Sequence, residues 1–192
     1  MTLTELQTTI TTPYFSTNQA QRLFAEDNPT YVNTQLQRMT QRGDLLRLKR
    51  GWYLFPHRQV DDLVLAGVLY EQSYVSLETA LNTYGILPDI PAQISSVTPV
   101  TSKQIETQRG IFAYSKVQQE LFFGYSQVQD QQSQLFYDLA DVEKAVLDLI
   151  YLRQVKSVDE YRFDLSTINQ DLLQEYKQFF PQWVQQVAED LL

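Results

Sequence analysis

The amino-acid sequence predicts an α+β protein with two domains. A small helical unit with a two-stranded ribbon is expected over residues 1–58, and a larger mixed α/β-type unit over residues 59–192. Residues 1–58 hold seven Lys/Arg against four Asp/Glu, whereas residues 59–192 hold eight against nineteen. Helix-like and strand-like spacings occur on both sides of the expected connection at residues 56–58. The charge asymmetry suggests that the two parts face different partners.

Two helices are expected before residue 28. Apolar side chains recur at helical spacing over residues 3–10 and predict the first helix. Ser16 and Gln19 have the spacing of a capping box, in which each side chain bonds the backbone N–H of the other residue. The second helix should therefore begin near Ser16 and end near residues 26–27.

A third helix is expected over residues 29–42. Asn28 can cap it, Pro29 suits its first position, and Gly43 can end it. One face is an apolar stripe of Val32, Leu36 and Met39. The opposite face carries hydrogen-bonding side chains without negative charge, namely Thr30, Tyr31, Thr34, Gln37, Arg38 and Gln41.

A tight ribbon should follow this helix. Residues 45–48 and 52–55 are strand-like, and Lys49, Arg50 and Gly51 join them in a short loop where glycine allows a positive φ. Helix, turn, helix and ribbon, in this order, are typical of a winged helix-turn-helix that binds DNA. The alternative is an ordinary helix and hairpin with a solvated basic face.

The winged-helix interpretation assigns roles to individual side chains. Thr30, Thr34 and Arg38 should approach base edges, with Gln37 and Gln41 beside them, because arginine reads guanine and glutamine reads adenine. The phosphate contacts are expected at Arg47, Lys49 and Arg50. Tyr31 and Arg42 complete the predicted DNA-binding set. About five phosphate contacts would make log K fall with log salt at a slope of about −4 to −5.

The larger unit should combine helices and strands. Helices are expected over residues 61–72, after Ser76, after Asp141 and in the tail from residue 157, which includes Leu165. Strands are expected at 93–98 and 111–117, an aromatic-rich strand or turn at 121–125, and a polar hairpin loop at 127–134.

Several groups in this unit have more than one interpretation. Glu143 and Lys144 could form an exposed ion pair, contact a partner or serve the structure, and a structural role is favoured. The aromatic clusters at 122–123 and at Phe179, Phe180 and Trp183 are expected in the core, but any exposed member would be a candidate partner surface.

The composition argues against an enzyme and against a cofactor. The chain has no cysteine, so a thiol nucleophile and a zinc ribbon are excluded. Its one histidine, His57, lies in the expected connection between the domains, which argues against a histidine-based triad or a histidine-rich metal site. No glycine loop of the phosphate-binding kind is present. Asp138, Asp141 and Glu143 could bind Mg²⁺, but helix starts favour acidic residues for electrostatic reasons alone.

The sequence also predicts a cytoplasmic protein. The first residues lack the basic and apolar pattern of a signal peptide. No run approaches the roughly 18 apolar residues that a membrane span needs.

The order of segments resembles the AbiEi family of antitoxins from type IV toxin–antitoxin systems. The matching segments are residues 42–53 (RGDLLRLKRGWY), 74–81 (YVSLETAL), 84–88 (YGILP), 96–98 (SVT), 110–114 (GIFAY) and 140–151 (ADVEKAVLDLIY). Their order and spacing over about residues 15–152 carry the resemblance, which fades after residue 155.

The resemblance implies a repressor with a winged helix that binds operator DNA, expected as inverted repeats, and a second domain needed for antitoxin action. Its partner would be a nucleotidyltransferase-like toxin. A solitary regulator without a toxin, and a protein-binding module whose winged helix no longer binds DNA, remain alternatives. One departure is that the second domain, which can share in DNA binding within the family, is strongly acidic here.

Overall fold

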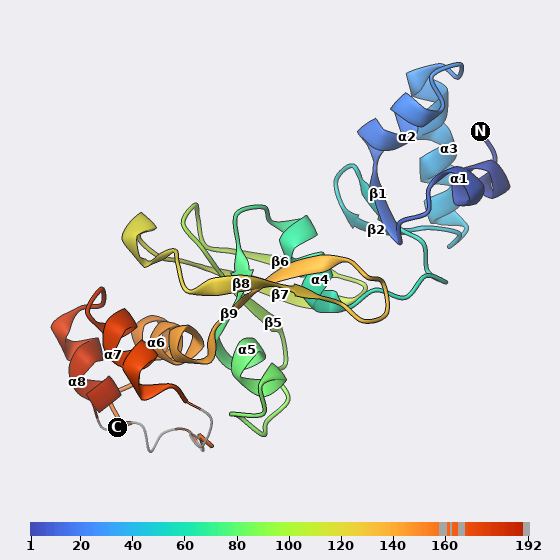
Figure 1. Ribbon diagram of the computed structural model, residues 1–192. Coiled ribbons are helices and arrows are strands. Elements are labelled where there is room, and N and C mark those ends of the chain that lie inside the picture. Colours follow the sequence, from blue (N-terminus) through green and yellow to red (C-terminus); the bar gives the residue numbers. More distant parts are fainter. Residues whose placement is uncertain (158–160, 162, 165–167, 190–192) are drawn as a thin grey trace. The chain divides into compact units, whose positions relative to one another are not determined.

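The protein has a mixed α+β fold, seen in a computed structural model that describes residues 1–157, 161, 163–164 and 168–189 (Figure 1). The chain divides into two compact units. Unit 1 comprises Met1–Asp61 with Thr107–Arg109 and Asp130–Leu135, and unit 2 comprises Asp62–Glu106, Gly110–Gln129 and Phe136–Leu192. In the described ranges, no helix is both long and apolar enough to cross a membrane.

Unit 1 consists of three helices and a small sheet. Its elements are α1 (Leu3–Thr9), β1 (Tyr14–Ser16), α2 (Thr17–Leu23), α3 (Pro29–Gln41), β2 (Leu46–Lys49) and β3 (Trp52–Leu54). The three helices and the two ribbon strands lie where the sequence predicts them, and the strand β1 was not expected. The strand order is β1-β3-β2, with β1 and β2 both antiparallel to β3.

Local caps explain why α2 and α3 begin where they do. The Ser16 hydroxyl oxygen accepts from the Gln19 N–H at 3.1 Å, which is one half of the predicted capping box. The Asn28 side-chain oxygen accepts from the Thr30 N–H at 2.8 Å, and Pro29 occupies the first turn of α3. Each cap satisfies a helical N–H that has no partner within its helix.

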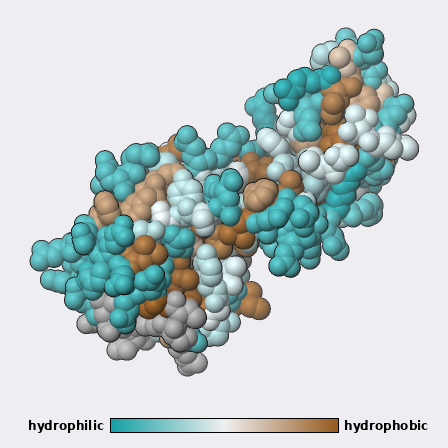
Figure 2. Space-filling view, viewed as in Figure 1, coloured by the Kyte–Doolittle hydropathy of each residue, from teal (hydrophilic) through white to brown (hydrophobic). Residues whose placement is uncertain are grey.

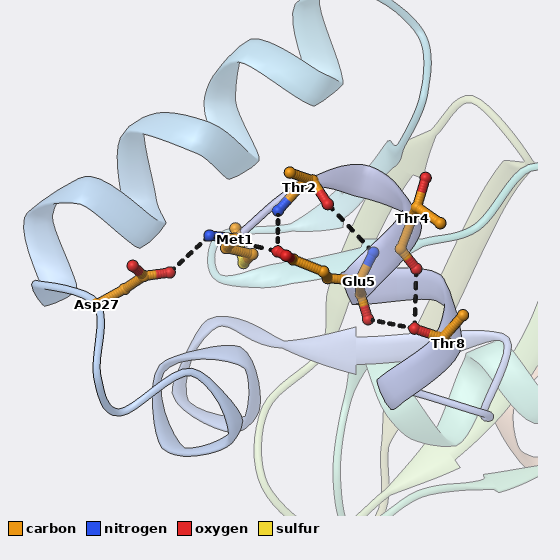
Figure 3. Close-up of polar contacts among 6 residues, drawn as sticks. All are labelled: Met1, Thr2, Thr4, Glu5, Thr8 and Asp27. Atoms are coloured by element: carbon orange, nitrogen blue, oxygen red, sulfur yellow. Dashed lines mark hydrogen bonds and ion pairs between the residues drawn. The ribbon is translucent and has the colours of Figure 1, made fainter.

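Contacts at the start of α1 link it to the turn before α3 (Figure 3). Thr2 and Glu5 form a complete capping box, with Thr2 N–H donating to Glu5 Oε2 at 2.7 Å. The Met1 amino group donates to Asp27 Oδ2 at 2.7 Å and lies 3.6 Å from Glu5 Oε2. Beneath these contacts, one core unites the helices and the sheet. It contains Leu6, Ile10, Phe15, Ala20, Val32, Leu36, Met39, Leu45 and Phe55.

Unit 2 is built on a mixed sheet. Its described elements are α4 (Asp62–Leu69), β4 (Tyr74–Val75), α5 (Leu77–Thr83), β5 (Ile94–Thr98), β6 (Lys103–Thr107), β7 (Gly110–Lys116), η1 (Gln119–Leu121), β8 (Tyr125–Gln129), β9 (Phe136–Ala140), α6 (Val142–Arg153), α7 (Gln170–Lys177) and α8 (Gln182–Glu189). The strand order is β6-β7-β5-β4-β9-β8. The β5–β7 and β4–β9 pairs are parallel, while the β4–β5 and β8–β9 pairs are antiparallel.

Several expectations for unit 2 need correction. The strands β4 and β6 were not predicted, because β4 is only two residues long and β6 is mostly polar. The polar loop expected at 127–134 is shifted, because β8 continues to Gln129 and pairs there with Phe136. In the tail, α7 and α8 are helical as expected, but the described residues 157, 161, 163–164 and 168–169 are not helical, so the helix expected from residue 157 is wrong there. Leu165 lies outside the described residues.

A buried polar network joins β4 to α6, and it gives Lys144 the structural role that was favoured for it. Lys144 and Asp148 are 0% exposed and form an ion pair, so Lys144 is not part of an exposed pair with Glu143. Asp148 Oδ2 accepts from the Tyr74 hydroxyl at 3.0 Å and from the Ser76 hydroxyl at 2.8 Å. Ser76 precedes α5 but forms no side-chain cap, because its hydroxyl serves Asp148 instead.

The Lys144 ammonium group is also surrounded by aromatic rings. It lies 5.3 Å from the ring centroids of Tyr74 and Phe123 and 5.1 Å from that of Phe180. Burial lowers the pKa of Lys144, and the neighbouring Asp148 opposes this shift. Ion pairing and cation–π contacts both compensate the charge for the water that it loses.

The surface of the face shown in Figure 2 is largely hydrophilic, with hydrophobic residues in small separate patches. Two aromatic side chains expected in the core are partly exposed, Phe179 at 59% and Trp183 at 40%. Phe180, between them in sequence, is buried as predicted. Phe179 and Trp183 are therefore a candidate partner surface.

Candidate nucleic-acid interface

A polar groove of about 840 Å³ lies between α3 and the β2–β3 ribbon. It is lined by Thr17, Asn33, Gln37, Thr40, Gln41, Arg47, Arg50, Gly51 and Tyr53. Two of these side chains are cationic, and among the residues that the structure describes no carboxylate lines the groove. We call this feature the α3–ribbon groove. Its charge suits a polyanionic ligand.

The buried stripe of α3 determines which side chains face this groove. Val32, Leu36 and Met39 are at most 1% exposed and hold one face of the helix against the core. At about 100° per residue, side chains four apart lie on nearly the same side of a helix. Asn33, Gln37 and Gln41 have this spacing, and all three are exposed and line the groove.

The three residues expected at base edges lie beside the groove rather than in its lining. Thr30 and Arg38 are exposed and Thr34 is half-buried. Thr34 donates its hydroxyl to the Thr30 carbonyl oxygen at 2.8 Å, so its side chain can offer a ligand an acceptor oxygen and a methyl group. Arg38 is about 100° around the helix from Gln37 and is not among the lining residues.

Tyr31 and Arg42 are on the same flank of α3 as Arg38, since positions 31, 38 and 42 are seven and four residues apart. Tyr31 is 44% exposed. Arg42 forms an exposed ion pair with Asp44, with 2.9 Å between Arg42 Nε and Asp44 Oδ2. None of these three residues is among those that line the groove.

The predicted phosphate contacts are also divided. Arg47 and Arg50 are exposed and line the groove. Lys49 is half-buried, and its Nζ lies 5.3 Å from the centre of the Trp52 ring. Gly51 turns the ribbon with a φ of +77°. Thr17 N–H donates to the Gly51 carbonyl oxygen at 2.8 Å, which ties the ribbon to the start of α2.

Five residues of the groove lining were not predicted from the sequence. Asn33 and Thr40 could have been found from their helical spacing to Gln37 and Gln41. Thr17, Gly51 and Tyr53 could not, because their places in the groove depend on packing between segments distant in sequence. Tyr53 pairs with both outer strands of the unit 1 sheet, opposite Phe15 and Arg47.

The carboxylates considered for Mg²⁺ have protein partners in the structure. Asp141 Oδ2 accepts from the Tyr176 hydroxyl at 3.0 Å, and Glu143 Oε1 accepts from the Asn169 N–H at 2.6 Å. Burial, followed by this contact with Asp141, raises the pKa of Tyr176 to about 12. Within the described ranges, no three His, Cys, Asp or Glu side chains are grouped so that they could hold a metal ion.

Comparison with protein families and with curated proteins supplies no relative for this interface. No family model matches the chain, and no curated protein matches it.

Proposed function

We propose that the protein is a winged helix-turn-helix DNA-binding protein that acts as a transcriptional repressor of the antitoxin type. In this proposal α3 enters the major groove and the β2–β3 ribbon is the wing. The observation that supports it best is the α3–ribbon groove, where Arg47 and Arg50 lie beside the exposed glutamines of α3 without a carboxylate among the described lining residues. The order of helices and strands in unit 1 agrees with such a domain.

The distribution of charge limits where DNA could bind. Residues 59–192 carry eleven more acidic than basic side chains, and residues 1–58 carry three more basic than acidic ones. Acidic groups repel DNA over about one Debye length, roughly 8–10 Å at physiological salt. A duplex should therefore bind at the cationic face of unit 1 rather than on unit 2.

The antitoxin role rests on the resemblance to the AbiEi family. Two of its matching segments, residues 74–81 and 140–151, contribute Tyr74, Ser76, Lys144 and Asp148 to one buried network. These two segments therefore act together in stabilising unit 2, and we treat them as one shared feature of the resemblance. The proposed partner is a nucleotidyltransferase-like toxin.

A second candidate function is protein binding without DNA binding. It is favoured by the partial exposure of Phe179 and Trp183 in the acidic unit. Aromatic side chains are enriched at the centres of protein interfaces. This candidate predicts that changes in the α3–ribbon groove leave the behaviour of the protein unchanged.

The test is DNA binding by the full chain across a range of salt concentrations. Fluorescence anisotropy would follow binding to a labelled 30-bp duplex from the region upstream of the gene. Each phosphate contact contributes about −0.9 to the slope of log K against log salt. Arg47→Ala and Arg50→Ala should each make the slope less steep by about this amount.

Lys116→Ala is the matched control. It also removes one exposed positive charge, but Lys116 lies on β7 of unit 2 and is not part of the groove lining. It should leave the slope unchanged. DNA binding that is absent, or that is equally insensitive to all three substitutions, would contradict the proposed function.

A further inference from the structure

We infer that α3 reads adenine–thymine pairs through Gln37 and Gln41, an inference that rests on the proposed DNA-binding function. In this inference the DNA sequence that the protein selects is read by the two glutamines rather than by Arg38. Four observations lead to it.

The first observation is the chemistry of the exposed line on α3. A glutamine amide has one acceptor oxygen and an NH₂ donor, which matches N6 and N7 on the major-groove edge of adenine. Gln37 and Gln41 are exposed, and neither side-chain amide has a hydrogen bond to the part of the protein that the structure describes. Their amides are therefore available to bases.

The second observation is the state of Asn33, the other amide on this line. Its Oδ1 accepts from Gln21 Nε2 at 3.0 Å, so one lone pair of that oxygen is already used by α2. Asn33 Oδ1 keeps a second lone pair, but the contact with Gln21 orients its amide toward α2. The two glutamines are therefore the readers, and Asn33 holds α3 against α2.

The third observation concerns the threonine side chains around the glutamines. Thr40 lines the groove, and its hydroxyl donates to the Leu36 carbonyl oxygen at 2.8 Å. Thr34 likewise donates its hydroxyl proton to the Thr30 carbonyl oxygen. With those protons used inside the helix, the methyl groups remain for apolar contact, and a threonine methyl suits the C5-methyl group of thymine.

The fourth observation is the position of the charges. Arginine pairs with guanine, and a carboxylate accepts from the cytosine N4 amino group. The arginines of the groove lining, Arg47 and Arg50, lie on the ribbon side. No carboxylate is among the lining residues that the structure describes. Arg38 is exposed on α3 but is not among the residues that line the groove.

The experiment is selection of bound duplexes from a randomised 20-bp library by the full chain, followed by sequencing. The expected motif has adenine at two positions of each half-site, with each preferred over other bases by about 5- to 150-fold. Gln37→Ala should relax the preference at one position, and Arg38→Ala should leave the motif intact. Gln37→Glu should change the adenine at that position to cytosine, because a carboxylate only accepts hydrogen bonds.

The outcomes separate this inference from the proposed function. A motif dominated by guanine, lost in Arg38→Ala and kept in Gln37→Ala, would overturn the inference and leave DNA binding in place. Binding without any motif would do the same. No binding to any duplex would overturn both. Circular dichroism of each variant, together with an unchanged salt slope for the uncharged substitution Gln37→Ala, excludes loss of folding as the cause.

Discussion

Replacing Lys144 with methionine should destabilise unit 2 more than any surface substitution. Methionine keeps an unbranched apolar side chain of similar length but removes the ammonium group. Asp148 would keep its hydrogen bonds from the Tyr74 and Ser76 hydroxyls while losing its only positively charged partner among the described contacts. Because Asp148 is 0% exposed, water cannot replace that partner.

The size of the effect follows from this burial. Removing one member of a buried ion pair costs about 3–5 kcal/mol, because the other charge stays uncompensated. With a urea dependence of about 2 kcal/mol per molar, the unfolding midpoint should fall by about 1.5–2.5 M. The double variant Lys144→Met, Asp148→Asn has no charge in the network and still offers an acceptor to the Tyr74 and Ser76 hydroxyls. It should therefore regain a large part of the lost free energy of unfolding.

Urea unfolding followed by tryptophan fluorescence would measure the stability of unit 2 in these variants. The chain has two tryptophans, and Trp52→Phe leaves only Trp183, which reports on unit 2. Both network variants should be compared in that background. A loss below about 1 kcal/mol for Lys144→Met, or a double variant less stable than the single one, would refute the account of the network. A single variant that fails to fold agrees with it only if the double variant folds.

Two further predictions concern backbone geometry and pH. Gly124 and Gly85 have φ values of +69° and +75°, but a Cβ at Gly124 would lie 3.0 Å from Tyr176 Cε2, whereas a Cβ at Gly85 meets nothing within 4 Å. In urea unfolding, Gly85→Ala should therefore lower the free energy of unfolding by about 1–2 kcal/mol, and Gly124→Ala should lower it by about 1–3 kcal/mol more. Equal losses of stability in the two variants would contradict the close packing at Gly124. Burial favours a raised pKa at Asp130, but hydrogen bonds from the Ser133 hydroxyl and from the backbone N–H groups of the turn outweigh it and lower the pKa. The Asp130 carboxylate therefore contributes stability that is present above about pH 4 and is lost as the pH falls through its lowered pKa. In unfolding measurements, Asp130→Asn should be less stable than the wild type at pH 6, and this difference should disappear near pH 2. A difference in stability that stays constant with pH would contradict the assignment.

Much of unit 1 could be predicted because its signals are local. The start of α3 depends on Asn28 and Pro29, and the ribbon turn depends on Gly51, all of which act on residues a few positions away. The strand β1 escaped prediction, because its three residues become a strand only through pairing with β3, where Tyr14 lies opposite Leu54. Propensity over three residues is too weak a signal without that partner.

For the candidate site, the residue types and their approximate location can be predicted from the sequence alone, since the sequence gives helical spacing and charge directly. Which flank of α3 meets the ribbon does not, because it depends on how Val32, Leu36 and Met39 rotate the helix against the core. The same holds for Lys144. Its place on a helix is predictable, but its burial beside Asp148 is set by the packing of α6 against the rest of unit 2, and such packing depends on contacts between residues far apart in the chain.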